Sequence, residues 1–263
     1  MEEKGPLSEH DIGDRVGVGW QCKSCFECEW CRQGDENLCL KQEATCVQHY
    51  GGFAKGVVAD GRFAFPIPEK LPSAYAAPLL CGGATVYAPF IEHQITAHTR
   101  VAILGIGGLG HLALQFARAH GCEVTAISSS PNKEKEAKEL GADHFILYKD
   151  LENHPNSFEF VFCTSSNGIE WEQAVALLRP RGKLCLIGVP TQPLQLPVGM
   201  LIDGRKIVCG SNIGSRPVIR QMLEFSGDRN IRPLIEEFPL EKVNAALDKI
   251  RSGKIRYRAV LVN

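Results

Sequence analysis

The chain has 263 residues, with 29 basic and 30 acidic side chains and a net charge of -1. This length allows two domains with a substantial core. The balanced charge, with no run of basic residues among aromatics, excludes no class outright but favours neither nucleic acid nor a membrane surface as a partner. The N-terminus lacks the apolar region of a signal peptide, and no segment is expected to span a membrane. We therefore expect a cytoplasmic protein.

A short strand is predicted over residues 14–19, where glycines bound an apolar pair. It is typical of the middle of a β-domain, and strands that it should pair with do not precede it. Further short strands are predicted between residues 53 and 67, before Pro68. Between these regions, Cys46 is expected to be a small buried residue and His49 a polar loop residue.

Five of the eleven cysteines fall in one short segment. Cys25, Cys28, Cys31 and Cys39 are spaced three, three and eight residues apart, so one irregular loop can surround a tetrahedral ion with four thiolates. Four sulfurs without a histidine predict a closed structural zinc site, because a catalytic zinc keeps a position open. A disulfide or free-thiol cluster is the alternative, which a cytosolic chain disfavours. Cys22 is expected to be a nearby free thiol, with replacement of one of the four ligands as the alternative.

A helix is predicted from Ala74 to Leu80, which Pro78 can interrupt, and a second from Thr85 to His93. Cys81 lies between them beside two glycines. Spacing alone favours a small buried residue there over a metal ligand.

A strand over residues 101–104 runs directly into glycines at the spacing G-x-G-x-x-G, and a helix is predicted over residues 111–120. Backbone amides at a helix start bind phosphate, and glycines allow the pyrophosphate to approach closely. A second strand at 123–127 completes the βαβ unit, so the context favours a dinucleotide site over a glycine-rich turn without ligand. The loop residues are Gly105, Ile106, Gly107, Gly108, Leu109 and Gly110.

Strands continue to alternate with helices after this unit. Strands are predicted at 144–147, 158–162, 183–187 and 207–210, and helices at 131–140 and 171–178. This alternation predicts an α/β fold with a doubly wound parallel sheet of the Rossmann type. Beyond Gly214, helices at 218–225 and 240–251 and a strand at 259–262 fall outside the alternation, so we expect part of this tail to return to the β-domain.

The end of the second strand favours NADP over NAD. An NAD site carries an acidic residue there, about 20 residues past the glycines. This chain has Ser128, Ser129 and Ser130 at that place, and Lys133 follows. Hydroxyls and an ammonium group can bind a 2′-phosphate, and no carboxylate repels it. The alternative is that the serines only cap the next helix.

Together these motifs resemble the zinc-dependent medium-chain alcohol dehydrogenases, and within them the cinnamyl alcohol dehydrogenase branch. The resemblance rests on the four-cysteine lobe, the glycine loop and the segments 78–83, 210–214 and 256–258, and covers nearly the whole chain. It implies an enzyme that interconverts primary alcohols and aldehydes with NADP. It further implies a partial, mainly β, GroES-like catalytic domain with the zinc lobe over residues 1–81, a dinucleotide-binding domain over 82–213, and a return to the catalytic domain over 214–263.

The resemblance also implies roles for individual residues. Cys81 becomes a ligand of the catalytic zinc, which reverses the preference from spacing, and a homodimer is expected through the sheet edge near Ile207 to Ser211. The further positions that match cofactor contacts are Thr85, Thr164, Gly188, Ser211, Asn212 and Ile213.

The chain departs from the family pattern at its start. The other catalytic zinc ligands of the family would precede Met1, and His10 does not replace them because Glu9 and Asp11 flank it. We expect either a fragment of an active NADP-dependent dehydrogenase or a catalytically silent NADP-binding protein. An enzyme that works without catalytic zinc is the third hypothesis, and it is disfavoured because it would leave Cys81 without a functional role.

Overall fold

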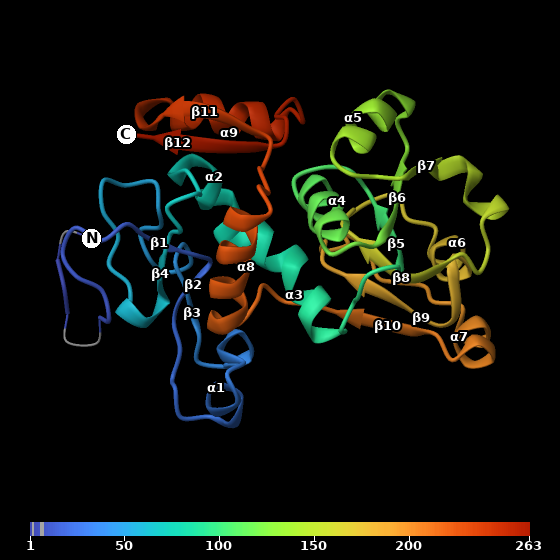
Figure 1. Cartoon of the computed structure of the whole chain (residues 1–263), viewed down its shortest axis with the longest axis horizontal. Coiled ribbons are helices and arrows are strands. Elements are labelled where there is room, and N and C mark those ends of the chain that lie inside the picture. The colour runs from blue at the N-terminus through green and yellow to red at the C-terminus, as the bar shows by residue number, and fades with distance from the viewer. Residues whose placement is uncertain (2, 6–7) are drawn as a thin grey trace. The chain divides into compact units, whose positions relative to one another are not determined.

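The computed structural model of the chain describes residues 1, 3–5 and 8–263 (Figure 1). The chain divides into two compact units. Unit 1 comprises residues 1–84 and 212–263, and unit 2 comprises residues 85–211. Unit 2 is one continuous segment, whereas unit 1 is built from both ends of the chain.

Unit 2 contains a six-stranded parallel sheet with the order β10-β9-β8-β5-β6-β7. Its middle strands are continuous apolar runs buried on both faces, as a parallel sheet covered by helices requires. The order places the first and fourth strands of the unit side by side, so that the chain leaves their carboxyl ends in opposite directions. The predicted doubly wound parallel sheet is confirmed. The strands are β5 (Arg100–Leu104), β6 (Glu123–Ser128), β7 (His144–Leu147), β8 (Phe158–Cys163), β9 (Leu178–Leu186) and β10 (Ile207–Gly210).

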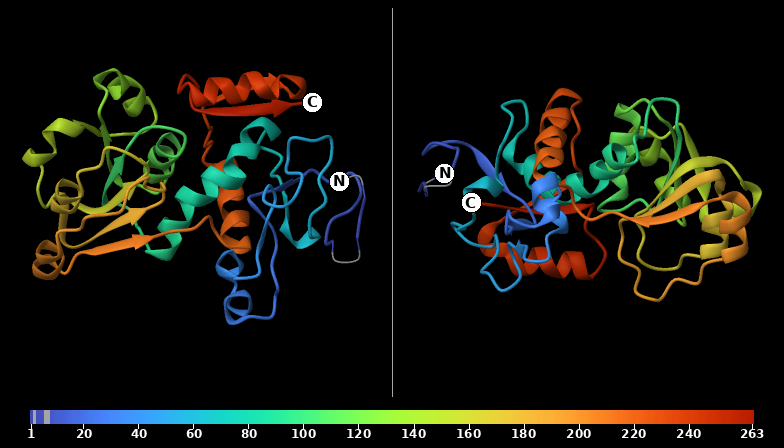
Figure 2. Two further views of the ribbon diagram at one scale, coloured as in Figure 1. Left: turned by 180° about the vertical axis from the view of Figure 1, so that it is seen from behind. Right: turned by 90° about the horizontal axis from the view of Figure 1, so that it is seen from below.

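Helices cover both faces of this sheet (Figures 1 and 2). Tyr87 and Phe90 on α3 are buried together with Phe116 on α4, and the three rings belong to an aromatic group that includes Phe162 on β8. The helical elements are α3 (Ala84–Glu92), α4 (Gly110–Ala119), η4 (Pro131–Lys133), α5 (Glu134–Glu139), η5 (Tyr148–Asn153), α6 (Trp171–Ala176) and α7 (Val198–Gly204).

Several elements of unit 2 differ from the sequence prediction: η5 was not predicted, and α6 ends at Ala176 instead of residue 178. Strand β9 begins at Leu178, five residues before the predicted start, because Leu178 pairs with Phe158 across an irregular register. Helix α7 was not predicted. Its apolar residues Val198 and Ile202 are 62% and 70% exposed, so the segment lacks the buried stripe that identifies a helix in a sequence.

The described residues of unit 1 form three two-stranded sheets instead of one large sheet. Strands β1 (Val16–Val18) and β4 (Ala64–Pro66) are antiparallel, as are β2 (Gln21–Lys23) and β3 (Glu43–Ala44). From the C-terminal segment, β11 (Ile235–Pro239) and β12 (Arg258–Val262) are parallel. The helical elements are α1 (Glu29–Gln33), η1 (Glu36–Leu38), η2 (Gly61–Phe63), α2 (Ser73–Pro78), η3 (Leu79–Gly83), α8 (Arg216–Asp228), η6 (Leu240–Lys242) and α9 (Val243–Arg251).

The strands predicted between residues 53 and 63 do not form. Residues 53–60 have no regular structure, and β4 begins only at Ala64. Val57 and Val58 are 45% and 95% exposed, so these apolar residues are not the buried face of a strand.

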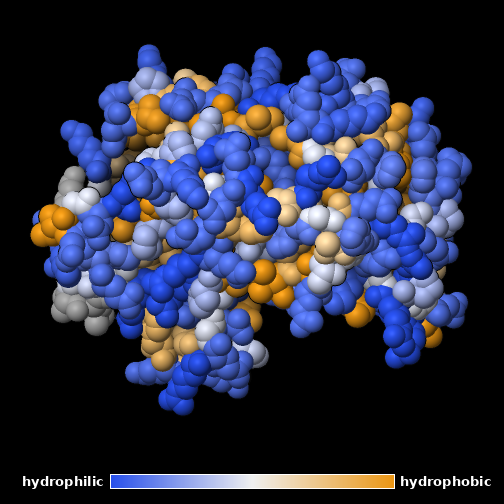
Figure 3. Space-filling model, viewed as in Figure 1, coloured by the Kyte–Doolittle hydropathy of each residue, from blue (hydrophilic) through white to orange (hydrophobic). Residues whose placement is uncertain are grey.

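The continuous helical run Ser73–Glu92 is long and apolar enough to cross a membrane, contrary to the sequence expectation. However, 61% of the most apolar 18-residue stretch of this run is buried within the protein, which is typical of a core helix. Pro78 does not end the run, because the chain passes into the wider π-helical turn η3 at this point. The molecular face in Figure 3 is mainly hydrophilic, with hydrophobic residues in small separate groups.

Candidate dinucleotide and zinc sites

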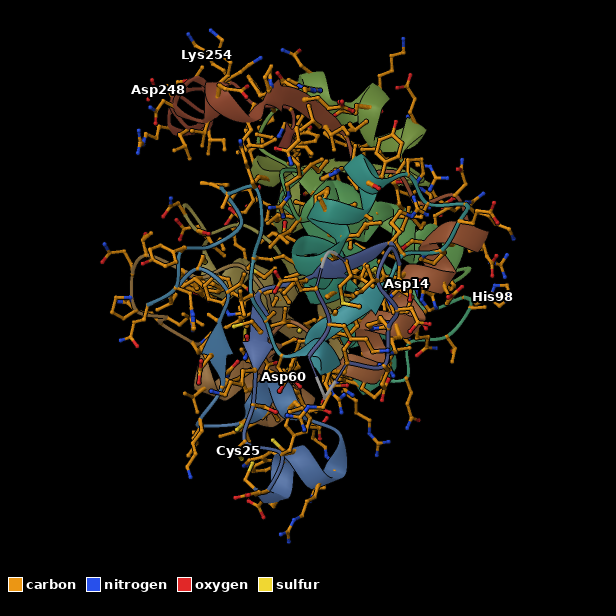
Figure 4. The ribbon with its side chains drawn as sticks, turned by 90° about the vertical axis from the view of Figure 1, so that its left-hand side faces the viewer. Asp14, Cys25, Asp60, His98, Asp248 and Lys254 are labelled. Carbon is orange, nitrogen blue, oxygen red and sulfur yellow. The ribbon has the colours of Figure 1, made fainter. Side chains whose placement is uncertain are left out.

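The four lobe cysteines bring their sulfur atoms together in unit 1. All four sulfurs lie within 4.8 Å of one another, and Cys25 Sγ is 3.9 Å from Cys31 Sγ and 3.5 Å from Cys39 Sγ. Four sulfurs placed tetrahedrally about 2.3 Å from zinc would be about 3.8 Å apart, so the residues fit the ion. Figure 4 shows Cys25 and its sulfur beside α1.

Backbone hydrogen bonds prepare the lobe for a cation. The amides of Glu27 and Cys28 donate to Cys25 Sγ, and these bonds lower the pKa of Cys25 to about 6. A thiolate is the form that binds metal. Cys22 is also buried, but its thiol donates to the carbonyl of Glu43, and it stands outside the cluster, as predicted.

The lobe is fixed to the rest of unit 1 by a buried ion pair. Glu36 on η1 is 2% exposed, and its Oε1 accepts a hydrogen bond of 2.8 Å from Arg216 Nε on α8. The guanidinium groups of Arg216 and Arg62 also lie 4.9 Å and 3.6 Å from the ring centroid of Phe26, the residue after Cys25. The C-terminal segment therefore positions a loop formed near the N-terminus.

Three of the four glycines after β5 meet different physical demands. Gly105 has φ +95°, which favours glycine. A Cβ at Gly110 would lie 1.9 Å from the Gly105 carbonyl oxygen, so α4 approaches the loop more closely than any side chain permits. A Cβ at Gly107 would meet no atom within 4 Å, which leaves this backbone open to a ligand. Thr164 stabilises the turn by donating from Oγ1 to the Gly105 carbonyl at 2.8 Å.

A cleft of about 380 Å³ opens at the carboxyl ends of β5, β6 and β8, beside this loop. This is the place where parallel sheets of this order bind dinucleotides. The predicted residues that line it are Gly105, Ile106, Gly107, Ser128, Ser129, Lys133 and Thr164. A larger hollow of about 750 Å³ lies elsewhere on unit 2 and includes none of the loop glycines.

The other predicted cofactor residues of unit 2 do not line this cleft. Gly108, Leu109 and Gly110 belong to the turn into α4, where the backbone begins the helix. Gly188 packs against the segment after β8, since a Cβ there would lie 2.8 Å from the Thr164 carbonyl oxygen. The remaining predicted cofactor residues of unit 2 that do not line the cleft are Thr85, Ser130 and Ser211. Their cofactor contacts stay predictions.

The cleft also has walls that the sequence analysis missed. Residues 165 and 167–169 follow β8, and Tyr148 begins η5 after β7. Polar and glycine residues directly after a predicted strand were an available signal, because strand ends form the binding edge of such sheets. Tyr148 gave no such signal, because its place depends on how η5 returns beside the sheet.

The described charged side chains that line the pockets at Ser128 and Ser129 are lysines and not carboxylates. Ser128 is buried and its Oγ accepts from the Ser130 amide at 3.2 Å, whereas Ser129 is exposed. Lys133 donates to the Ile106 carbonyl, and Lys149 lines an adjoining shallow hollow with Ser129. Within the described part of the chain, no carboxylate lines the cleft or this hollow.

Cys81 stands in the π-helical turn of unit 1. Its thiol has solvent contact, so the buried interpretation from spacing is wrong, and Cys46 is exposed as well. Surrounding protein atoms nevertheless desolvate the Cys81 thiol enough to raise its pKa, which the neighbouring Arg258 guanidinium opposes. Among the residues that the structure describes, Cys81 is not grouped with two further potential metal ligands.

Asn212 and Ile213 belong to unit 1. The Asn37 side-chain amide donates to the Asn212 carbonyl at 2.8 Å, and Asn212 returns a bond of 3.2 Å to the Asn37 carbonyl. Ile213 is buried with φ +50°. These contacts join the segment to the zinc lobe, and the predicted cofactor contacts of both residues remain predictions.

Two family models match the chain. The model described as alcohol dehydrogenase GroES-like domain matches residues 2–69, and the one described as zinc-binding dehydrogenase matches residues 108–227. The chain is 40% identical to an aldehyde reductase of Synechocystis over 254 residues, which are 95% of this chain and 76% of that protein. It is 39% identical to a probable cinnamyl alcohol dehydrogenase of Oryza sativa over 269 residues, 97% of this chain and 73% of that one.

Solved structures agree with these matches. A cinnamyl alcohol dehydrogenase from Sorghum bicolor has a TM-score of 0.89 at 36% identity, covering 97% of this chain and 76% of its own. One from Helicobacter pylori, complexed with NADP(H), has a TM-score of 0.88 at 30% identity and the same coverage. The chain therefore belongs to the zinc-dependent medium-chain alcohol dehydrogenases, in the branch of the cinnamyl alcohol dehydrogenases.

Proposed function

We propose that this protein uses NADP(H) to interconvert a primary alcohol and the corresponding aldehyde. The observation that carries the proposal is the cleft of unit 2, where the open backbone at Gly107 lies near Ser129 and Lys133 with no carboxylate in the described wall. Family membership supports the reaction, and the NADP(H) complex of the Helicobacter pylori relative supports the cofactor.

Unit 2 is the proposed dinucleotide-binding domain. The pyrophosphate would lie over Gly107 at the start of α4, where backbone amides and the helix dipole favour negative charge. The 2′-phosphate would contact the Ser129 hydroxyl, with Lys133 and Lys149 supplying positive charge. Bound NADP(H) supplies or accepts the hydride. The chain's own residues bind and orient it.

Unit 1 is the proposed catalytic domain, and its lobe thiolates of Cys25, Cys28, Cys31 and Cys39 would hold a structural zinc. A closed four-sulfur site leaves no position for substrate, so this ion would stabilise the lobe instead of taking part in the reaction. Cys81 is the proposed ligand of a catalytic zinc. Because the described residues bring no ligand pair to it, we derive no catalytic step through that ion.

We also propose a cytoplasmic homodimer. Strand β10 is the edge of the six-stranded sheet, and Ile207 on it is 45% exposed. An unpaired edge strand with an exposed apolar residue is suited to pair with a second copy. Sedimentation at several concentrations tests this assembly, and a monomer at all of them would disprove it.

The test of the function combines NADPH binding, measured by fluorescence titration, with an assay of NADPH-dependent aldehyde reduction. We expect tighter binding of NADPH than of NADH, and turnover of an aldehyde. Substituting Ser129→Asp should weaken NADPH binding by about 10- to 100-fold, because a lost charge-assisted contact is replaced by repulsion. Ser129→Ala is the matched control and should have a smaller effect.

Two results would decide against the proposal. Equal affinity for NADPH and NADH, unchanged in Ser129→Asp, would contradict the cofactor assignment. Binding of NADPH without turnover of any primary alcohol or aldehyde would leave a silent NADP-binding protein as the function.

A further inference from the structure

A second group of metal-binding side chains lies at the edge of the sheet in unit 2. It consists of His93, which directly follows α3, Cys185 on β9 and Cys209 on β10. None of the three lines the nucleotide cleft. The mechanism proposed above therefore makes no use of them.

The sheet itself brings the two thiols together. Cys185 and Cys209 are direct partners in the parallel register of β9 and β10, so both side chains point to the same face of the sheet. Neighbouring strands are about 4.8 Å apart, which is close to the separation of two ligands on one ion. His93 approaches this face from α3.

The ligand atoms have the spacing that zinc requires. The two Sγ atoms and one imidazole nitrogen all lie within 4.8 Å of one another, and Cys209 Sγ is 3.5 Å from His93 Nε2. Tetrahedral zinc with Zn–S about 2.3 Å and Zn–N about 2.05 Å would place a sulfur and a nitrogen about 3.6 Å apart. The zinc lobe of unit 1 has similar ligand spacings, 3.5 and 3.9 Å.

We propose that His93 Nε2, Cys185 Sγ and Cys209 Sγ form a second zinc site, which leaves a fourth position for water. Cys185 is fully buried, whereas His93 and Cys209 are half-buried, so an ion can enter from the solvent side. Glu92, next to His93, is held at the same edge by a hydrogen bond of 3.2 Å from Ser211 Oγ. The ion would join the end of α3 to the neighbouring strands β9 and β10.

The same side chains also form a complete metal-free arrangement. Lys183 Nζ is 3.5 Å from His93 Nδ1, so the lysine donates to Nδ1 while Nε2–H donates to Cys209. When Nε2 binds zinc, the proton of the neutral ring must be on Nδ1, where it faces the Lys183 ammonium. The Lys183 ammonium group must then move away from His93 Nδ1, and its positive charge weakens binding of the zinc ion.

The experiment measures bound zinc in the full chain after purification under reducing conditions and dialysis against a weak chelator. We expect Cys209→Ser and His93→Asn each to bind one zinc fewer than wild type. Cys122→Ser is the matched control, because Cys122 is a buried thiol of unit 2 outside the group, and it should keep the wild-type zinc content. NADPH binding should be unchanged in all three variants, so failure here is distinguishable from failure of the proposed function.

Two further measurements make the assignment specific. Cobalt(II) in a variant with all four lobe cysteines changed to serine should still show the thiolate charge-transfer absorption of a two-sulfur site, and adding Cys209→Ser to this variant should remove most of that absorption. Lys183→Met should bind zinc about two- to tenfold more tightly than wild type, because a nearby positive charge is removed. Equal zinc content in wild type, Cys209→Ser and His93→Asn would overturn the proposal.

Discussion

Gly107 and Gly110 belong to one loop but carry opposite constraints. A methyl group at Gly107 meets nothing within 4 Å, so Gly107→Ala should leave the thermal midpoint of unfolding nearly unchanged. It should weaken NADPH binding by about tenfold or more, because the methyl group would occupy the proposed place of the pyrophosphate. Unaltered affinity in a titration with NADPH would show that the phosphates bind elsewhere.

Gly110→Ala is the matched comparison. Its Cβ would lie 1.9 Å from a backbone oxygen, so the loop or the helix must move. We expect a loss of about 1–3 kcal/mol in the free energy of unfolding, in addition to weaker binding. Denaturant titration separates the two variants.

Arg216 makes the second prediction at the scale of single residues. The Glu36 carboxylate that pairs with it is 2% exposed, so Arg216→Met leaves a buried charge uncompensated. The expected loss of stability is about 3–5 kcal/mol, measured by denaturant unfolding. In Glu36→Gln/Arg216→Met, part of this loss should be recovered, although the contact of Arg216 with the Phe26 ring is also gone.

Arg220→Met serves as the surface control, since Arg220 and its partner Glu9 are both exposed. Its effect should stay below about 0.5 kcal/mol. If both arginine variants lost the same small amount, the buried pair would not be holding the lobe.

At the scale of elements, η2 begins with a capping interaction that is sensitive to acid. The Asp60 side chain accepts from Arg62 Nε at 2.9 Å and from the Arg62 amide at 3.0 Å, and these bonds, the side-chain bond most of all, hold the pKa of Asp60 below its usual value. A depressed pKa means that the stabilisation is complete above the unfolded pKa of about 3.9 and is lost as pH falls through the folded pKa.

Asp60→Asn should therefore be less stable than wild type at pH 7 by about 0.5–2 kcal/mol, and the difference should shrink below about pH 4. Chemical denaturation at several pH values measures this. A stability difference that does not change with pH would show that the charge of Asp60 contributes nothing.

Most strands of the parallel sheet were predictable because their buried residues form short apolar runs, whereas the polar first half of β9 was missed. The sequence prediction of β7 and β10 matches their bounds in the structure. Strands β2 and β3 were not predictable, since these short strands depend on pairing with each other across about 20 residues of chain. The same cause explains the error at Val57 and Val58, where apolar side chains found no partner strand.

The zinc lobe was visible in the sequence because its ligands are close along the chain. The group of His93, Cys185 and Cys209 was not, because Cys209 and His93 are 116 residues apart and only the sheet order brings them together. The exposure of Cys81 could not be predicted from the sequence either. It depends on the wide turn that the helix adopts after Pro78.

At the scale of the whole molecule, the lobe and the nucleotide cleft belong to different units. Cys39→Ser should weaken zinc binding in the lobe and destabilise unit 1 by about 1 kcal/mol or more, because metal binding contributes directly to the folding of such loops. Unit 2 should keep its affinity for NADPH. Zinc analysis, calorimetry and cofactor titration together measure this separation.

Cys22→Ser provides the control, because Cys22 is a buried thiol of the same region outside the cluster. Its zinc content should equal that of wild type. Loss of NADPH binding in Cys39→Ser, with unit 2 still folded, would contradict the independence of the two sites.

The discontinuity of unit 1 has a consequence for synthesis on the ribosome. Unit 2 is complete once residue 211 has emerged, whereas unit 1 still lacks α8, β11 and β12. Until Arg216 has been synthesised, Glu36 lacks its ion-pair partner, and the zinc lobe is not fixed to α8. A chain that stops within residues 212–263 would therefore contain all of unit 2 but an incomplete unit 1, although most of unit 1 is translated before unit 2.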